Sequence, residues 1–131
     1  MILPAIPIRQ PWAWAILRLG KDCENRSWPL PQKYAGVPIL IHAGKTIDPD
    51  DMNYFLSLDI QQTIILETGG IVGVTAFSEN GSLAGKSIWA EIAKHHWRID
   101  RARTKELPFF PCTGRLGFFT VDYPYKLPEG W

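Results

Sequence analysis

Apolar residues recur with a helical period in three parts of the chain. The first helix is predicted over Pro11–Leu19, with Gly20 as a left-handed cap at its end. Its apolar stripe consists of Trp12, Ala15, Ile16 and Leu19. A second helix is predicted to begin after Asp48, because an Asp side chain suits the N-cap and Pro49 suits the first turn. The spacing also predicts a short third helix over Ser87–Lys94, with Trp89 and Ile92 turned inward.

Short runs of apolar and β-branched residues predict the strands. These runs are Ala5–Ile8, Cys23–Trp28, Val37–Ala43, Gly70–Phe77, Trp97–Ile99 and Gly114–Val121. Prolines on both sides of Ala5–Ile8 indicate an edge strand or an extended arm. Two prolines and several cations in Arg101–Pro111 indicate a basic loop. Five or six strands with two or three helices predict an α+β fold or a mixed β-barrel, and not a doubly wound sheet.

Length and composition place the chain among ordinary globular domains. Its 131 residues correspond to a single domain over 1–131, and 46% hydrophobic residues exclude wholesale disorder. The two cysteines, Cys23 and Cys112, lie outside any metal-binding spacing, so we expect no zinc, no other metal and no cofactor. The apolar start lacks a basic leader region and is interrupted by Arg9. We therefore expect a soluble, cytoplasmic protein that does not bind a membrane.

The net charge of +1 hides an uneven distribution along the chain. Residues 1–45 carry a net charge of +4, residues 46–91 a net charge of −6, and residues 92–131 a net charge of +3. The two basic ends could meet in the fold and form a basic face that attracts polyanions. Ordinary scatter of charges over a solvated surface explains the same numbers equally well.

The segment IRQPWAWAILRLGKDCENRSWP concentrates candidate chemistry at the two ends of the first predicted helix. Before the helix lie Arg9, Gln10 and Trp12, and after it lie Lys21, Glu24, Arg26 and Trp28. In an extended segment the side chains of Glu24, Arg26 and Trp28 share one face, because a strand has a period of two. The pattern indicates a site at this end of the helix. A structural cluster of ion pairs that holds a turn is the alternative.

This segment resembles the opening of the ASCH domain, a family named for its homology to the transcription coactivator ASC-1. The resemblance rests on the entry Gln10–Ala13, the Lys21-x-x-Glu24-x-Arg26 core and the continuation Glu24–Pro29. Later strands are also similar to those of the family, namely Val37–Lys45, Gly70–Phe77 and Gly114–Phe119. The family pattern has a glycine two positions before the lysine, where this chain has Leu19.

The resemblance implies a small mixed-strand PUA-like β-barrel with helices at its side, and a cleft that binds RNA or a nucleotide. Cationic side chains in such a cleft can contact phosphates, and tryptophans can stack on bases. Glu24 would orient Lys21 or accept a hydrogen bond from a base amino group. The candidate binding residues are Arg9, Gln10, Trp12, Lys21, Glu24, Arg26, Trp28 and Lys45. A weaker pattern, Thr113-Gly114-Arg115, suits a further contact with a nucleic-acid backbone.

The resemblance also implies an enzymatic alternative. Similar small bacterial proteins include amidohydrolases that deacetylate N4-acetylcytidine, in which the family lysine is the central catalytic group, helped by a threonine and a glutamate. Lys21 matches that lysine, Glu24 stands at the threonine position, and Glu91 is the nearest counterpart of the glutamate. Lys21 and Glu24 are accordingly the candidate catalytic residues, for deacetylation or for a metal-independent ribonuclease. A third alternative is an adaptor that binds other proteins, of which no partner can be named.

Overall fold

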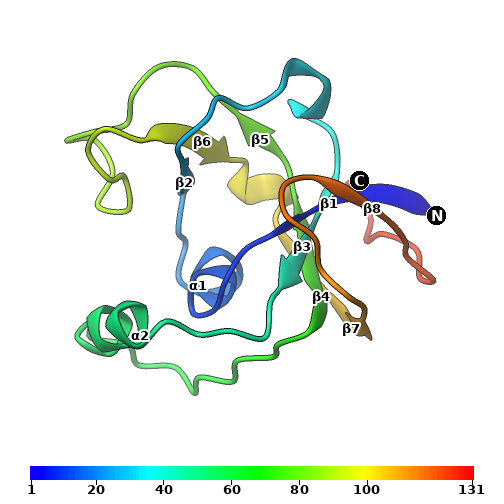
Figure 1. Ribbon diagram of the computed structural model, residues 1–131, viewed down its shortest axis with the longest axis horizontal. Coiled ribbons are helices and arrows are strands. Elements are labelled where there is room, and N and C mark those ends of the chain that lie inside the picture. The colour runs from blue at the N-terminus through cyan, green and yellow to red at the C-terminus, as the bar shows by residue number, and fades with distance from the viewer.

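Two β-sheets make up most of the fold in the computed structural model, which describes residues 1–131 (Figure 1). The larger sheet has the order β7-β4-β3-β1-β8. Its strands are β1 (Ile2–Pro7), β3 (Ile39–Ala43), β4 (Gly70–Thr75), β7 (Lys105–Pro111) and β8 (Phe119–Asp122). The smaller sheet has the order β2-β6-β5, with β2 (Cys23–Arg26), β5 (Phe77–Ser78) and β6 (His95–Ile99). The α+β class is therefore confirmed, although the two sheets are not closed into a barrel.

The prediction of an edge strand near the N-terminus is wrong, because β1 pairs on both sides. Its first half runs antiparallel to β8 and its second half runs parallel to β3. Only Ala5 has a partner in both neighbours. Pro4 pairs with β8 alone and Pro7 with β3 alone, so each proline leaves one side of the backbone free. This offset allows two prolines in a strand that lies inside a sheet.

The first two predicted helices are confirmed, and the first matches its predicted bounds within one residue at each end. Helix α1 (Trp12–Arg18) ends before Gly20, whose φ of 70° is left-handed as predicted. Helix α2 (Pro49–Leu56) begins at Asp48, whose carboxylate accepts the backbone N–H groups of two first-turn residues. Two 3-10 turns, η1 (Gln32–Tyr34) and η2 (Arg101–Arg103), complete the helical elements. None of the helices has the length and apolar character that crossing a membrane would require.

The predicted third helix over Ser87–Lys94 is wrong. The segment is irregular, Ile92 is 85% exposed, and Ala93 has a left-handed φ of 62°. Side chains of the small sheet form hydrogen bonds with the backbone of this segment. Asn25 on β2 binds groups of Trp89 and Glu91, and His96 on β6 binds the Glu91 carbonyl. These contacts take backbone groups that a helix would have paired internally.

The predicted basic loop over Arg101–Pro111 is also wrong. Its first residues form η2, and the rest is strand β7, which pairs antiparallel with β4. Strand β7 lies at the edge of the large sheet, and an edge position tolerates the prolines that suggested a loop.

The two faces of the large sheet belong to two separate clusters of buried residues, because alternate side chains point to opposite faces. On one face, Ile6, Ile39 and Ile41 join Ala13 and Ile16 of α1 and three residues of the small sheet, Phe77, Trp97 and Ile99. On the other face, Leu3, Ala5 and Leu40 pack with Val121 and Tyr123. Figure 1 shows the small sheet above α1 and α2 below it. Trp12 and Trp14 of α1 pack against Phe55 of α2. Helix α1 is therefore held between the small sheet and α2.

Candidate functional site

A cavity of about 740 Å³ lies where the edge strand β2 faces the start of α1, helix α2 and the irregular segment 88–94. We call it the Lys21 cavity. Its aromatic walls are Trp12, Tyr54 and Trp89, and its charged residues are Arg9, Lys21, Glu24, Arg26, Asp51, Glu91 and Lys94. The remaining lining residues are Pro7, Ile8, Asn25, Ile88, Ala90 and Leu116. Five of the eight predicted binding residues, Arg9, Trp12, Lys21, Glu24 and Arg26, therefore meet in one place.

Lys21 supplies a buried ammonium group to this cavity. The turn after α1 places it there, since the Lys21 N–H donates to the Ala15 carbonyl at 3.1 Å. Its side chain is only 5% exposed. Its Nζ donates to the Cys23 carbonyl and lies 3.6 Å from Oε1 of Glu24. An ammonium has three protons to donate, so these contacts leave capacity for a ligand acceptor.

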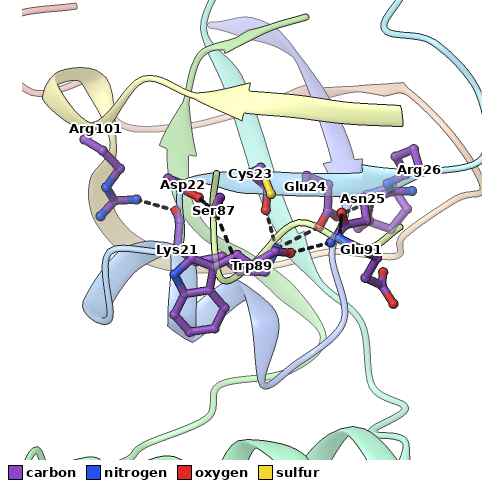
Figure 2. Close-up of polar contacts among 11 residues, drawn as sticks. Lys21, Asp22, Cys23, Glu24, Asn25, Arg26, Ser87, Trp89, Glu91 and Arg101 are labelled. Atoms are coloured by element: carbon purple, nitrogen blue, oxygen red, sulfur yellow. Dashed lines mark hydrogen bonds and ion pairs between the residues drawn. The ribbon is translucent and has the colours of Figure 1, made fainter. Parts of the chain in front are cut away.

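Glu24 and Arg26 complete a charged group with Lys21. Oε2 of Glu24 accepts from Nη2 of Arg26 at 3.0 Å, and the same nitrogen donates to the Pro7 carbonyl at 2.6 Å. The Arg26 guanidinium also lies 5.6 Å from the centre of the Trp97 ring. Figure 2 shows Glu24 and Arg26 on β2 and Lys21 just before this strand, with contacts drawn as dashed lines. The predicted cluster of ion pairs is therefore present, and it forms one side of the cavity.

The irregular segment that carries Trp89 and Glu91 is fastened by two residues that lie opposite each other in the small sheet. Asn25 and His96 are paired across β2 and β6. The Asn25 amide donates to the Trp89 carbonyl at 2.9 Å and accepts the Glu91 N–H at 2.9 Å (Figure 2). Nε2 of His96 donates to the Glu91 carbonyl at 2.6 Å, and its Nδ1 accepts the Leu83 N–H at 2.8 Å. The buried imidazole thus holds one neutral tautomer.

The aromatic side chains form a connected wall. The Trp12 ring lies 6.0 Å from Tyr54 and 6.5 Å from Trp89, between ring centres, and the Trp12–Trp89 pair is edge-to-face. The three rings come from α1, α2 and the irregular segment. Such rings give a flat ligand apolar faces on which to stack.

A second layer of contacts supports the turn that presents Lys21. Nη1 of Arg101 donates to the carbonyls of Ile16 and Lys21, at 2.6 and 3.0 Å. Burial lowers the pKa of Arg101 below its ordinary value, against the raising effect of Asp22. Burial has the opposite effect on the Cys23 thiol, whose pKa it raises above the ordinary value of 9.0, because burial disfavours the charged form of either group. This cysteine is a buried, protonated packing residue and not a nucleophile.

Three predicted binding residues lie outside the Lys21 cavity. Gln10 is buried, and its amide accepts the Trp14 N–H at 2.8 Å and donates to the Glu67 carbonyl at 2.9 Å, so it caps the first turn of α1. Trp28 packs edge-on against Trp97, with 4.8 Å between ring centres. Lys45 lines a separate hollow at the end of β3.

The cavity is of mixed charge, which differs from the predicted basic cleft. Its four cations face three carboxylates, and Arg9 lies 3.6 Å from Asp51 as a further ion pair. The sequence reasoning missed Tyr54 and Asn25 as lining residues and placed Trp89 in a helix core. The alternation along β2 could not have indicated Asn25, because a period of two places it on the face opposite to Glu24 and Arg26.

No protein-family model matches the chain, and no curated protein matches it either. Residues 1–131 contain no group of three or more His, Cys, Asp or Glu side chains arranged to hold a metal ion. The interpretation of the cavity therefore depends on its own geometry.

Proposed function

We propose that the protein binds RNA or a nucleotide by holding one base in the Lys21 cavity. One observation carries this proposal: a buried ammonium with a proton to donate faces a cavity walled by Trp12, Tyr54 and Trp89. Aromatic rings stack on a base face, and a fixed donor reads an acceptor on the base edge. The limited volume and mixed charge of the cavity favour a single base over a duplex.

The polar groups of the cavity suggest which base edge it reads. Lys21 can donate to a base carbonyl oxygen. The Glu91 carboxylate lines the cavity and makes no hydrogen bond or ion pair within the chain, so it can accept from a base amino group. Glu24 is already engaged by two cations and serves to hold Lys21. A base with both a carbonyl and an amino group, such as cytosine, suits this pair.

We further propose that the chain belongs to the ASCH family and has a PUA-like arrangement of its strands. The support is local. The Lys21-x-x-Glu24-x-Arg26 residues form one charged group beside a cavity, and Gln10 of the entry motif caps the helix that leads to it. The core cluster between the large and small sheets is the feature that a PUA-like barrel would enclose.

Titration of the protein with cytidine, uridine, adenosine and guanosine tests the proposal, with tryptophan fluorescence or calorimetry as the readout. Lys21→Met keeps the stem of the side chain and removes its donors, so the best ligand should bind at least about tenfold more weakly, as expected when a hydrogen bond to a charged group is lost. Trp89→Ala should also weaken binding, and it perturbs the buried core less than Lys21→Met does, because Trp89 is only partly buried. Lys33→Met, at an exposed lysine on η1, is the control.

The outcome that contradicts the proposal is clear for each arm. Either none of the four nucleosides binds, or Lys21→Met and Trp89→Ala both bind as tightly as the unmodified protein. Circular dichroism of each variant checks that it is folded. If Lys21→Met does not fold, the comparison of Trp89→Ala with Lys33→Met still decides the question.

A hydrolase acting on N4-acetylcytidine is the second candidate, because Lys21 and Glu91 line the same cavity. In that reaction water adds to the acetyl carbon, the bond to N4 breaks, and acetate and cytidine leave. Lys21 would be the central catalytic residue. Its ammonium group, however, donates to the Cys23 carbonyl and pairs with Glu24, and both contacts favour a proton donor over a base. Incubation with N4-acetylcytidine should release acetate above the level of the Lys21→Met variant, and equal release by both would reject this activity.

A further inference from the structure

A second hollow of about 820 Å³ lies beside the Lys21 cavity, at the ends of β3 and β7. We call it the Lys45 hollow. Lys45 and Gly44 follow β3, Gly69 precedes β4, and the loop from Thr113 to Arg115 follows β7. Much of its lining is therefore loop backbone. The N–H groups of Gly69 and Cys112 are bonded to the Ala43 and Gly69 carbonyls, whereas those of Thr113 to Arg115 have no backbone acceptor within the chain and are available to an anion.

The Lys45 hollow is basic, unlike its neighbour. Lys45 and Arg115 are both exposed, and neither takes part in an ion pair. None of the eleven lining residues is a carboxylate. Lys45 belongs to the basic first third of the chain and Arg115 to the basic last third, so the two basic ends meet here. The acidic middle contributes no carboxylate to this surface.

Close backbone packing shapes the floor of the hollow. A Cβ atom on Gly69 would lie 3.2 Å from Cε of Lys45, so the lysine stem lies across this glycine. A Cβ atom on Gly114 would lie 2.6 Å from the His42 ring. His42 is about 2% exposed, and its Nε2 lies 2.8 Å from the Cys112 carbonyl, to which it donates. Its Nδ1 has no hydrogen-bond partner, which leaves an unpaired polar atom at this floor.

The Lys21 cavity and the Lys45 hollow adjoin each other. Pro7 and Leu116 line both of them. Leu116 is 99% exposed, so it lies at the surface between the two. A ligand that crosses Pro7 and Leu116 can therefore occupy both at once.

We propose that the Lys45 hollow is a phosphate site, and that it holds a phosphate of the ligand whose base lies in the Lys21 cavity. The proposal rests on the proposed function for the base and adds the Lys45 and Arg115 side chains as the groups that bind the phosphate. A lysine and an arginine without acidic partners, next to the unbonded backbone N–H groups of Thr113 to Arg115, suit a phosphate. The ligand is accordingly a phosphate-bearing nucleotide or an RNA strand, and a free nucleoside fills only half of the site.

Affinities for cytidine, cytidine 5′-monophosphate and the dinucleotide CpC test this proposal. The double variant Lys45→Ala/Arg115→Ala should weaken binding of a phosphate-bearing ligand by about tenfold or more at low salt, and leave cytidine binding within about twofold. The control Lys33→Ala/Lys126→Ala removes the same charge from exposed sites outside both cavities, and should leave every affinity within about twofold. A preference for the monophosphate identifies a nucleotide as the phosphate source, whereas a preference confined to CpC identifies a strand.

A titration with inorganic phosphate separates the two proposals. Amide resonances of Thr113 to Arg115 should shift saturably in the unmodified protein and not in the double variant. If cytidine fails to bind but phosphate shifts these amides, the base proposal fails and the phosphate site stands. If neither phosphate-bearing ligand gains affinity over cytidine, or the gain survives in the double variant, the phosphate site is wrong.

Discussion

Replacement of Glu24 by alanine should destabilise the fold strongly, because it removes the carboxylate that two largely buried cations share. The carboxylate lies 3.6 Å from Nζ of Lys21 and 3.0 Å from Nη2 of Arg26, and its side chain is only 11% exposed. Removal of one partner from a buried ion pair typically costs 3–5 kcal/mol.

The expected loss lies near the lower end of that range, at about 3 kcal/mol. Lys21 keeps its contact with the Cys23 carbonyl, and Arg26 keeps the Pro7 carbonyl, so neither cation is left without an acceptor. A loss of this size is a large share of the roughly 5–15 kcal/mol that stabilises a typical domain.

Urea denaturation followed by tryptophan fluorescence measures the effect. With a slope of about 2 kcal/mol per molar urea, the midpoint should fall by about 1.5 M. Glu24→Gln keeps the volume and removes the charge, so it should lose most of the same stability. Glu106→Ala is the matched control, since Glu106 pairs with Arg18 at 2.7 Å while both side chains are 50% exposed. An exposed pair of this kind contributes at most about 1 kcal/mol.

The reasoning is refuted if Glu24→Ala and Glu106→Ala lower the free energy of unfolding by the same amount. That result would mean that Lys21 and Arg26 are solvated well enough to stand alone. Glu24 would then be a replaceable surface carboxylate, and its place in the motif would have no structural cause.

Three further predictions concern the loop, a buried tyrosine and a tightly packed glycine. Asn25→Ala should accelerate hydrogen exchange of the Glu91 amide and weaken nucleoside binding several-fold, because the Asn25 side chain bonds both the Trp89 carbonyl and the Glu91 N–H. Unchanged exchange would show that Asn25 does not hold the irregular segment in place. Burial raises the pKa of Tyr123 from 10.0 to about 12. Because the folded chain holds this proton more tightly than the unfolded chain, the stability that it contributes is complete below pH 10 and is lost as the pH rises toward 12. The melting temperature of Tyr123→Phe should therefore fall less between pH 10 and 12 than that of the unmodified protein. Gly70→Ala would place a Cβ atom 2.4 Å from the Phe110 carbonyl oxygen and should cost about 1–3 kcal/mol, whereas Gly44→Ala meets nothing within 4 Å; equal melting temperatures for the two would contradict this packing.

The features that local rules control were predictable from the sequence. Gly20 ends α1 and Asp48 caps α2, because each depends on a few neighbouring residues. The Lys21, Glu24 and Arg26 side chains meet because a turn and a four-residue strand fix their relative positions. These parts of the site needed no knowledge of the rest of the fold.

The errors arise where distant contacts override local pattern. Ser87–Lys94 has a helical spacing, but Asn25 and His96, from other segments, hold its backbone in an irregular form. Tyr54 and Trp89 reach the cavity from α2 and from this irregular segment, and nothing near them in sequence indicates that destination. Lys45 lies in the neighbouring hollow because β3 ends on the far side of Pro7 and Leu116.

The indole N–H resonances of the six tryptophans test the central claim most directly. Only Trp12 and Trp89 line the Lys21 cavity, while Trp131 binds the Arg103 carbonyl elsewhere. During titration with cytidine 5′-monophosphate, the signals of Trp12 and Trp89 should shift saturably and that of Trp131 should stay in place. No saturable shift, or equal shifts at Trp131 and Trp12, would contradict a base-binding cavity at Lys21.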